Sequence, residues 1–314
     1  MLETIAYSIF NGVLYGTLLF MMSSGLTLIF GMMGVLNFAH ASFYMLGAYF
    51  AYTLGLTTGF WLALILAPIA VGAMGALVER YGLRRVHQYG HVPELLFTFG
   101  LAYVIEELVA LFWGTVPIPY KAPAVMNTTA FTMFDLDYSW FKVFILLVAV
   151  AMFVGLWLLL MKTRAGQVIQ AALSRPDMVG ALGHNVPLVF TLVFAFGCAL
   201  AGLGGVVGGI QFVTDPGMAF MMGPIVFVVV VLGGLGSVPG ALVASLIIGI
   251  LQTFFLSINF SLAETIGTFN IENSGFFGVL WHMEATRIAP VLPFLLLVLT
   301  LIFRPRGIFG KREA

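Results

Sequence analysis

Charged residues are the scarcest class in this sequence. Only 8% of the 314 residues are Asp, Glu, Lys or Arg, and 13 basic residues balance 13 acidic ones. Soluble domains carry about 25% charged residues. With 61% hydrophobic residues and a mean hydropathy of +1.09, the composition excludes a water-soluble domain and predicts a polytopic membrane protein. The zero net charge gives no indication of a nucleic-acid partner.

Cysteine and catalytic motifs are also scarce. The lone Cys198 lies in an apolar run, which excludes an internal disulfide and most thiolate metal sites. The sequence has no Gly-x-x-x-x-Gly-Lys-Ser/Thr loop, so we expect that the chain does not itself hydrolyse ATP. The five histidines lack metal-ligand spacing, and no hydrolytic set of residues is present. The sequence therefore predicts no catalytic residue, no metal site and no cofactor.

The amino terminus, MLETIAYSIF, lacks the positively charged leading region of a cleavable signal peptide. We therefore expect the first apolar run to be retained as a membrane span.

The stretch that organises the chain is 25–49, GLTLIFGMMGVLNFAHASFYMLGAY. It begins as an apolar helix, is expected to break at Gly31 and Gly34, and places Asn37 and His40 where hydrocarbon should be. A broken span exposes unpaired N–H and C=O groups, which persist only where protein buries them or where they line a wet cavity. Polar side chains at such a break predict a passage for a solute.

Several side chains near the break would suit that passage. Asn37 and His40 are three residues apart and share a face of the resumed helix. Hydroxyls and aromatic rings nearby would offer hydrogen bonds and an apolar wall to a small zwitterionic or carboxylate solute. The alternative for His40 is a hydrogen bond between two helices. The predicted substrate path comprises Asn37, Phe38, His40, Ser42 and Tyr44.

Apolar runs predict an all-α polytopic membrane protein with about 8–10 transmembrane helices and broken or re-entrant segments. The whole chain, 1–314, is expected to form a single transmembrane domain. The nine runs cover about 6–30, 38–56, 59–78, 93–113, 140–161, 187–210, 218–235, 241–258 and 288–303.

The basic residues predict the orientation. The joints 79–92 and 162–186 and the carboxyl-terminal tail hold ten of the 13 Lys and Arg residues, and nine spans place all three segments on one side. That side is predicted to be cytoplasmic, with the carboxyl terminus inside. The loops 114–139 and 259–287 would then lie on the outer side. They would lie along the membrane, receive a soluble partner or simply cap the helices.

Glycine spacing predicts close helix packing. Small residues recur every four positions in 201–209, which lets helix backbones approach. The segment 233–240, GGLGSVPG, is either a tight turn or a second broken segment. The segment 59–79 has a small-residue spacing similar to that of 239–252, which points to a possible inverted repeat.

Two adjacent carboxylates, Glu106 and Glu107, fall in the outer half of the fourth span. Carboxylates within a membrane are costly. We expect a polar contact within the bundle, and the alternative is a cation site of an ion-gradient-driven secondary transporter.

The joint 162–186 carries a second signal. Apolar residues recur with helical spacing over 165–173, which predicts an amphipathic helix. Ser174 and Asp177 fit a capping box, and Gly183 suits a helix end, so a short helix is predicted over 175–182. Such a helix could transmit force from a soluble motor subunit. An ordinary loop is the alternative.

The motif GLTLIFGMMGVLNFAHASFYMLGAY closely resembles the signature of permeases of branched-chain amino-acid ABC importers. The joint 163–185 resembles the contact loop for the ATPase in that family, and GGLGSVPGALVASLIIGILQ and LIFRPRGIFG are also similar to it. The resemblance covers nearly the whole chain. It implies that Arg164, Gly166, Ser174, Asp177 and Gly183 couple the permease to the ATPase.

The resemblance further implies that 1–314 form one permease domain of an importer in a bacterial inner membrane, with the loops 114–139 and 259–287 in the periplasm. The importer would have two permeases, often different, two cytoplasmic ATPases that bind ATP, and a periplasmic solute-binding protein. ATP binding would drive alternating access. Many members read Asn-Phe-Ala-His-Gly-Glu, whereas this chain has Ala41 and Ser42 at the last two positions. The family also handles amides, urea and some aromatic acids, so branched-chain amino acids are the first expectation. The rivals are a secondary transporter of a small organic solute and a membrane-embedded enzyme.

Overall fold

In the computed structural model, residues 2–133, 136–174, 176–257 and 285–310 are described. The described part is mainly helical, which confirms the predicted all-α polytopic class. The longer helices are α1 (Leu2–Met33), α2 (His40–Thr58), α3 (Phe60–Val78), α5 (His91–Trp113), α6 (Trp140–Lys162), α7 (Arg164–Ser174), α9 (Val186–Gln211), α10 (Met218–Gly233), α11 (Val238–Ser257) and α15 (Leu292–Phe303).

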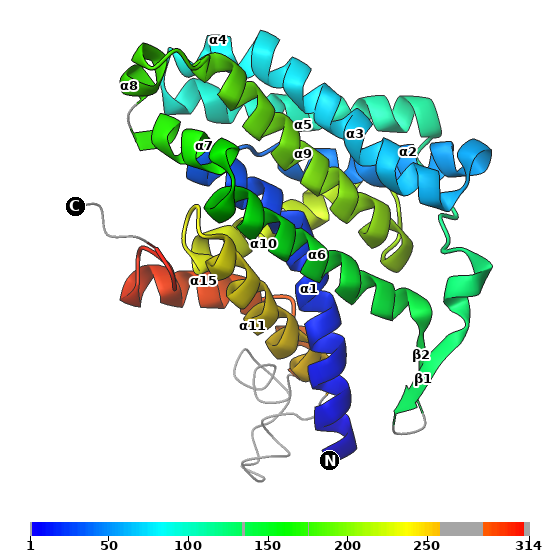
Figure 1. Cartoon of the computed structure of the whole chain (residues 1–314). Helices are drawn as coiled ribbons and strands as arrows, with labels where there is room; N and C mark the ends of the chain where they lie inside the picture. Colours follow the sequence, from blue (N-terminus) through cyan, green and yellow to red (C-terminus); the bar gives the residue numbers. More distant parts are fainter. Residues whose placement is uncertain (1, 134–135, 175, 258–284, 311–314) are drawn as a thin grey trace, which may run out of the picture.

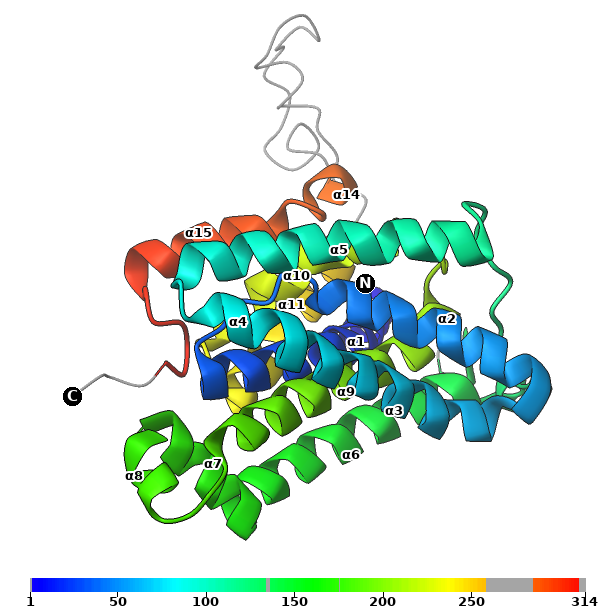
Figure 2. The same cartoon turned by 90° about the horizontal axis from the view of Figure 1, so that it is seen from above.

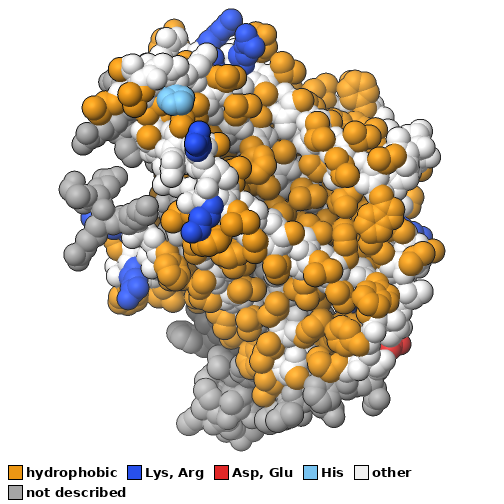
Figure 3. Space-filling model, in the orientation of Figure 1, with side chains coloured by type: hydrophobic (Ala, Val, Ile, Leu, Met, Phe, Trp, Pro, Cys, Tyr) orange, Lys and Arg blue, Asp and Glu red, His pale blue; other side chains and the backbone are white. Residues whose placement is uncertain are grey.

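Helix α1 is the centre of the molecule. It packs along α11 and α9 and also touches α6 and α10 (Figure 1). Within its span Ile5–Met33, 83% of an apolar 18-residue window is buried inside the protein, whereas the corresponding fraction is 22% for α5 and 28% for α6. Apolar side chains cover much of the face seen in Figure 3. Six described helices are long and apolar enough to cross a membrane, and α10 and α15 are shorter apolar helices.

The basic segments gather at one end of the molecule, which we call the basic end. It comprises the π-helical turn η1 (Glu79–Leu83), α4 (Arg84–His87), the start of α7, the short helix α8 (Pro176–Ala181) and the tail after α15. Figure 2 shows α4, α7, α8 and the carboxyl terminus on the same side.

Buried ionic contacts secure the basic end. The carboxylate of Glu79 accepts two hydrogen bonds from Arg84, at 3.1 and 2.8 Å, and a third at 2.5 Å from the hydroxyl of Thr191 on α9. Arg84 also donates to the carbonyl of Pro187 at 2.7 Å. Glu79 is only 2% exposed, and a buried charge of this kind is tolerated because it is paired and hydrogen-bonded. These bonds join the end of α3 to the start of α9.

A small hairpin lies at the opposite end. Strands β1 (Thr129–Met133) and β2 (Leu136–Ser139) pair antiparallel within the predicted 114–139 loop, after the 3-10 turn η2 (Ala124–Asn127). Tyr138 packs edge-on against Phe10 of α1, with ring centroids 4.4 Å apart. The hairpin is therefore attached to the start of the central helix. The predicted 259–287 loop lies largely outside the described residues, which resume with the short helix α14 (Ala285–Ile288).

Glycines set the distance between the central helices. A Cβ added at Gly205 of α9 would overlap the carbonyl oxygen of Tyr44, and one at Gly47 would overlap the carbonyl of Gly202. The crossing of α1 with α9 is equally close, because a Cβ at Gly25 would overlap the carbonyl of Gly197. The predicted small-residue stripe on α9 therefore packs against α1 and α2.

Nine of the described helices correspond to the nine predicted spans, with shifts at their ends. The expected break at Gly31 is wrong, because α1 continues through Gly31 to Met33. Gly31 has a packing role instead, since a Cβ there would lie 2.7 Å from the Cα atom of Gly236. The chain first leaves the helix at Gly34, which has a φ of +67°.

The Gly-rich segment 233–240 forms a tight turn between α10 and α11, the first of its two predicted alternatives. Gly234 and Gly236 both have positive φ, and Gly236 contacts the end of α1. The pairs α2–α3 and α10–α11 therefore turn at opposite ends of the molecule, as an inverted repeat requires. The duplication itself stays a prediction.

The close approach of α2 to α9 predicts opposite outcomes for two glycine substitutions. Gly205→Ala should lower the free energy of unfolding by about 1–3 kcal/mol, because the methyl group must push two backbones apart. Gly155→Ala is the matched control, since nothing lies within 4 Å of a Cβ at that position in α6. It should raise stability by about 0.5–1 kcal/mol through its higher helix propensity. Unfolding of each purified protein in detergent measures both changes, and equal effects would contradict the proposed packing.

Candidate functional site

The site begins where the first helix ends. From Gly34 to Ala39 the chain runs back alongside α1, so that α2 begins beside Met22. Met22 lies eleven residues before Met33, or about 16 Å along the helix axis. Six extended residues can span about 20 Å. The first turn of α2 therefore starts roughly half a bilayer thickness away from the basic end.

Local hydrogen bonds satisfy backbone groups in this break. The amide of Gly34 donates to the carbonyl of Phe30 at 2.9 Å, and the amide of Phe38 donates to Thr98 Oγ1 of α5 at 3.3 Å. The amide of Ala39 donates to Asn37 Oδ1 at 3.1 Å. Three amides of the break are thus paired within the protein, as a broken span requires.

His40 connects α2 to α1. Its Nε2 lies 3.1 Å from the carbonyl oxygen of Met22, and the residue is 2% exposed. Because a carbonyl only accepts hydrogen bonds, Nε2 carries the proton, and Nδ1 of the neutral ring is left as an acceptor. Nδ1 has no hydrogen-bond partner in the described part of the chain. His40 therefore forms the hydrogen bond between two helices that was predicted as its alternative role. Its Nδ1 is still free to accept a hydrogen bond from a solute.

The side-chain amide of Asn37 likewise has one paired atom and one unpaired atom. Its Oδ1 is occupied by the Ala39 amide, which makes Nδ2 the free end of the side chain. Nδ2 is buried and has no partner among the described residues. Asn37 is 3% exposed. An unpaired buried donor is costly, so it marks a position where a ligand or water would be favourable.

Both side chains line one cavity of about 330 Å³. Its walls come from the break, the first turn of α2, and helices α5, α10 and α15. Figures 1 and 2 together place α5 and α15 along one side of the molecule with α10 between them, and the cavity lies in this groove. Ligand pockets typically measure about 300–1,000 Å³, so the cavity suits one small molecule.

The cavity is mainly apolar. The ring of Phe38 stacks on Phe227 of α10, with centroids 6.2 Å apart and an interplanar angle of 23°. Ser42 lies on the wall contributed by α2. The remaining aromatic and aliphatic wall includes Phe99, Phe220, Phe294 and Leu297.

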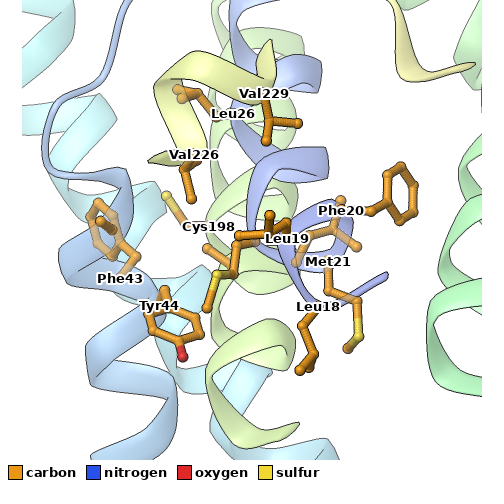
Figure 4. Packing of buried hydrophobic residues seen from close by; sticks show 14 of the residues in the cluster. Leu18, Leu19, Phe20, Met21, Leu26, Phe43, Tyr44, Cys198, Val226 and Val229 are labelled. Atoms are coloured by element: carbon orange, nitrogen blue, oxygen red, sulfur yellow. The ribbon is translucent and has the colours of Figure 1, made fainter. Parts of the chain in front are cut away.

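Four of the five predicted path residues, Asn37, Phe38, His40 and Ser42, are thus brought together around this cavity. Tyr44 is not among the lining residues. It points from α2 into the packed core (Figure 4), and its hydroxyl lies near Gly208 of α9. The sequence could not distinguish these two faces, because α2 is apolar all round and buried over most of its length.

Sequence reasoning missed the residues of the opposite walls. Thr98, which holds the break, and the rings of Phe99 and Phe227 carry no local signal, because each lies within an ordinary apolar helix. Only the packing of α5 and α10 against the break brings them to the cavity.

Glu106 and Glu107 do not reach this cavity. Glu106 is half-buried and Glu107 is exposed. Both line a separate pocket with Asp215, at the carboxyl-terminal part of α5 and opposite the basic end. No carboxylate is among the residues that line the cavity in the described structure.

The predicted coupling segment forms two short helices at the basic end. The predicted helix over 175–182 is confirmed as α8. Gly183 ends it with a φ of +88°, and the amides of Gly183 and His184 donate back to the carbonyls of Gly180 and Val179. This is a Schellman arrangement, in which a left-handed glycine closes the helix. The predicted helix end is therefore confirmed.

The other predicted coupling residues differ in exposure. Arg164 is exposed, whereas Gly166 is buried where α7 turns against the end of α6. The amide of Gly166 donates to Thr163 Oγ1 at 3.0 Å. The side chains of Ser174 and Asp177 lie outside the described residues, so the predicted capping box stays a prediction.

Comparison with known proteins agrees with this architecture. Residues 8–301 match the family described as "Branched-chain amino acid transport system / permease component". The chain is 29% identical over 316 residues to the high-affinity branched-chain amino acid transport system permease protein BraD of Pseudomonas aeruginosa, covering 96% of this chain and 95% of that one. It is 28% identical to LivH of Escherichia coli K12, a permease protein of the same description, over 97% and 95% of the two chains.

A probable branched-chain amino acid transport permease protein LivH of Methanocaldococcus jannaschii is also 28% identical, over 96% of this chain and 91% of that one. No solved structure matches the chain. The family match, the nearly full-length relatives and the apolar helices agree with one another. The chain is a multi-pass membrane protein and belongs to the family of permease components of branched-chain amino acid transport systems.

Proposed function

We propose that this chain is the permease subunit of an ATP-driven importer that moves branched-chain amino acids, or a related small carboxylate or amide, across the inner membrane by alternating access. The observation that carries the proposal is the polar break inside an apolar cavity halfway along the helices. Unpaired atoms of Asn37 and His40 lie there beside an aromatic wall. The relatives named above supply the substrate class.

The basic end would face the cytoplasm, because Lys and Arg concentrate on the inner side of membrane proteins. Helix α8 and the turn after it would then be the contact for two ATPase subunits. Leu182 in that turn is 79% exposed, which suits a partner surface outside the membrane. The buried Glu79–Arg84–Thr191 contacts join this region to α3 and α9. A movement at the ATPase contact would be transmitted through these hydrogen bonds to the helices of the bundle.

A second permease subunit would cover the groove between α5 and α15. The cavity lies in that groove, and Phe38 is 48% exposed in the isolated chain. A polar solute path cannot open sideways into lipid, since hydrocarbon would not solvate the solute. A permease partner on this side would complete the wall, and a periplasmic binding protein would deliver the solute at the opposite end.

An ion-coupled secondary transporter is the less favoured alternative. It needs a titratable or cation-binding carboxylate close to the solute. Glu106 and Glu107, the carboxylates that the sequence offers for that role, line a different pocket.

Replacing Asn37 tests the path. Asn37→Leu keeps the approximate size of the side chain and removes the free amide, so ATP-driven leucine uptake into proteoliposomes should fall about ten- to hundredfold, as expected for loss of a hydrogen bond to a charged group. The yield of the assembled complex should not change.

Tyr44→Phe is the control for this experiment. It also removes a buried polar group on α2, but one that does not line the cavity. Uptake by this variant should equal that of the wild type. Normal uptake by Asn37→Leu would remove Asn37 from the path.

Gly183→Arg tests the ATPase contact. The long cation and the unfavourable left-handed backbone at Gly183 should disturb the turn after α8. Substrate-stimulated ATP hydrolysis and uptake should both fall about tenfold, which corresponds to ~1.4 kcal/mol at the contact. Gly90→Arg is matched, because Gly90 also has positive φ, at +95°, in the neighbouring joint of the basic end. Equal losses in the two variants would contradict a specific role for the 162–186 joint.

A further inference from the structure

We propose that the cavity beside the break is a transit site that binds one apolar amino acid as a zwitterion. The α-carboxylate would lie at the first turn of α2 against Asn37 Nδ2, the ammonium at His40 Nδ1, and the side chain against the aromatic wall. This inference rests on the proposed importer function and adds a binding site inside the permease itself.

The start of α2 provides positive potential. A helix amino terminus carries roughly half a positive charge from its aligned peptide dipoles. In α2 the amides of His40 and Ser42 already donate to the carbonyls of Asn37 and Ala39, so the dipole rather than free N–H groups would attract an anion. No side chain caps the amino terminus of α2, and its first turn holds no acidic residue. Solvent and salt screen such an end at a protein surface, but this one is buried among helices. The attraction between the dipole and an anion is therefore stronger here than at an exposed helix end, and it offsets part of the cost of removing the anion from water.

A second, independent feature is the free end of Asn37. Its Oδ1 is held by the Ala39 amide, so Nδ2 is the end left to donate. The residue is 3% exposed, lines the cavity, and Nδ2 has no partner among the described residues. A carboxylate that accepts from Nδ2 would satisfy this donor and sit next to the first turn of α2.

His40 complements the other charge of a zwitterion. Its proton is on Nε2, where it is used by the Met22 carbonyl, so Nδ1 can only accept. An ammonium group is a donor without acceptor capacity. The same small region therefore offers a donor for the carboxylate and an acceptor for the ammonium, contributed by two residues three positions apart.

The rest of the wall selects the side chain. Phe38 and Phe227 form a stacked pair, and further apolar side chains of α5, α10 and α15 complete the surface. Branched aliphatic side chains gain about 25 cal/mol per Å² of apolar surface removed from water. A charged side chain would find no counter-charge among the described lining residues. The site thus favours apolar over charged amino acids.

The test uses a thiol placed in the cavity. In Gly223→Cys the new side chain fits, because a Cβ at Gly223 would lie 3.4 Å from the Cβ of Ala41 in the first turn of α2. The native Cys198 is fully buried and should contribute little background. The assembled importer in proteoliposomes is treated with 2-aminoethyl methanethiosulfonate, and mass spectrometry measures the modification rate. A thiol at the exposed position Asn127, from Asn127→Cys, is the control.

Leucine should slow modification at position 223 at least about fivefold and leave position 127 unchanged. Leucinamide, which lacks the carboxylate, should not protect. Adding Asn37→Asp places a negative charge beside the carboxylate and should raise the leucine concentration for half-protection about ten- to hundredfold. Adding Tyr44→Phe should leave that concentration unchanged.

Three results would overturn the site. The first is equal protection by leucine and leucinamide, and the second is an Asn37→Asp variant with an unchanged leucine concentration for half-protection. The third is a Gly223→Cys variant whose thiol does not react in the absence of leucine. ATP-driven leucine accumulation by the same proteoliposomes is measured in parallel. Accumulation without protection overturns the transit site and keeps the importer function. Protection without accumulation keeps the site and overturns the importer function.

Discussion

The structure depends on the backbone contact of α9 with α1 and α2. At Gly25, Gly47 and Gly205 the helices approach so closely that a single methyl group would overlap a carbonyl oxygen of the neighbour. In a membrane, association between helices comes from such close packing, because lipid tails are as apolar as the side chains. This contact fixes α2 against the core, and its first turn therefore stays halfway along α1.

At that position the break in the helix exposes backbone groups, and it also supplies polar atoms for the proposed solute path. A chain that leaves its helix inside a membrane must satisfy its backbone groups, and here α5 and Asn37 supply bonds to Phe38 and Ala39. Two polar atoms at the break have no partner among the described residues: the donor Nδ2 of Asn37 and the acceptor Nδ1 of His40. Both lie where α10 and α15 form an apolar cavity. Polar atoms over an apolar pocket are a common arrangement in sites for small amphipathic ligands.

The basic end is joined to this region through α9. The Glu79–Arg84 pair and Thr191 join α3 to α9, and α9 begins directly after the joint that carries α7 and α8. The proposed ATPase contact is thus adjacent in the chain to α9, which also contacts α2 through its glycines. The proposed ATPase contact and the proposed solute path are joined to the same helix.

The sequence by itself determined the membrane class, the nine apolar helices, the basic end, the short helix α8 and its end at Gly183, because these follow from hydropathy, charge and glycine conformation. It also located the break near Asn37 and His40. Only the tertiary structure decided that Gly31 stays helical, that Tyr44 faces α9 rather than the cavity, and that α5, α10 and α15 supply the other walls. The physical reason is that α2 and its neighbours are apolar on every side, so hydrophobic pattern cannot tell which face meets a cavity, and close packing between distant segments makes that choice.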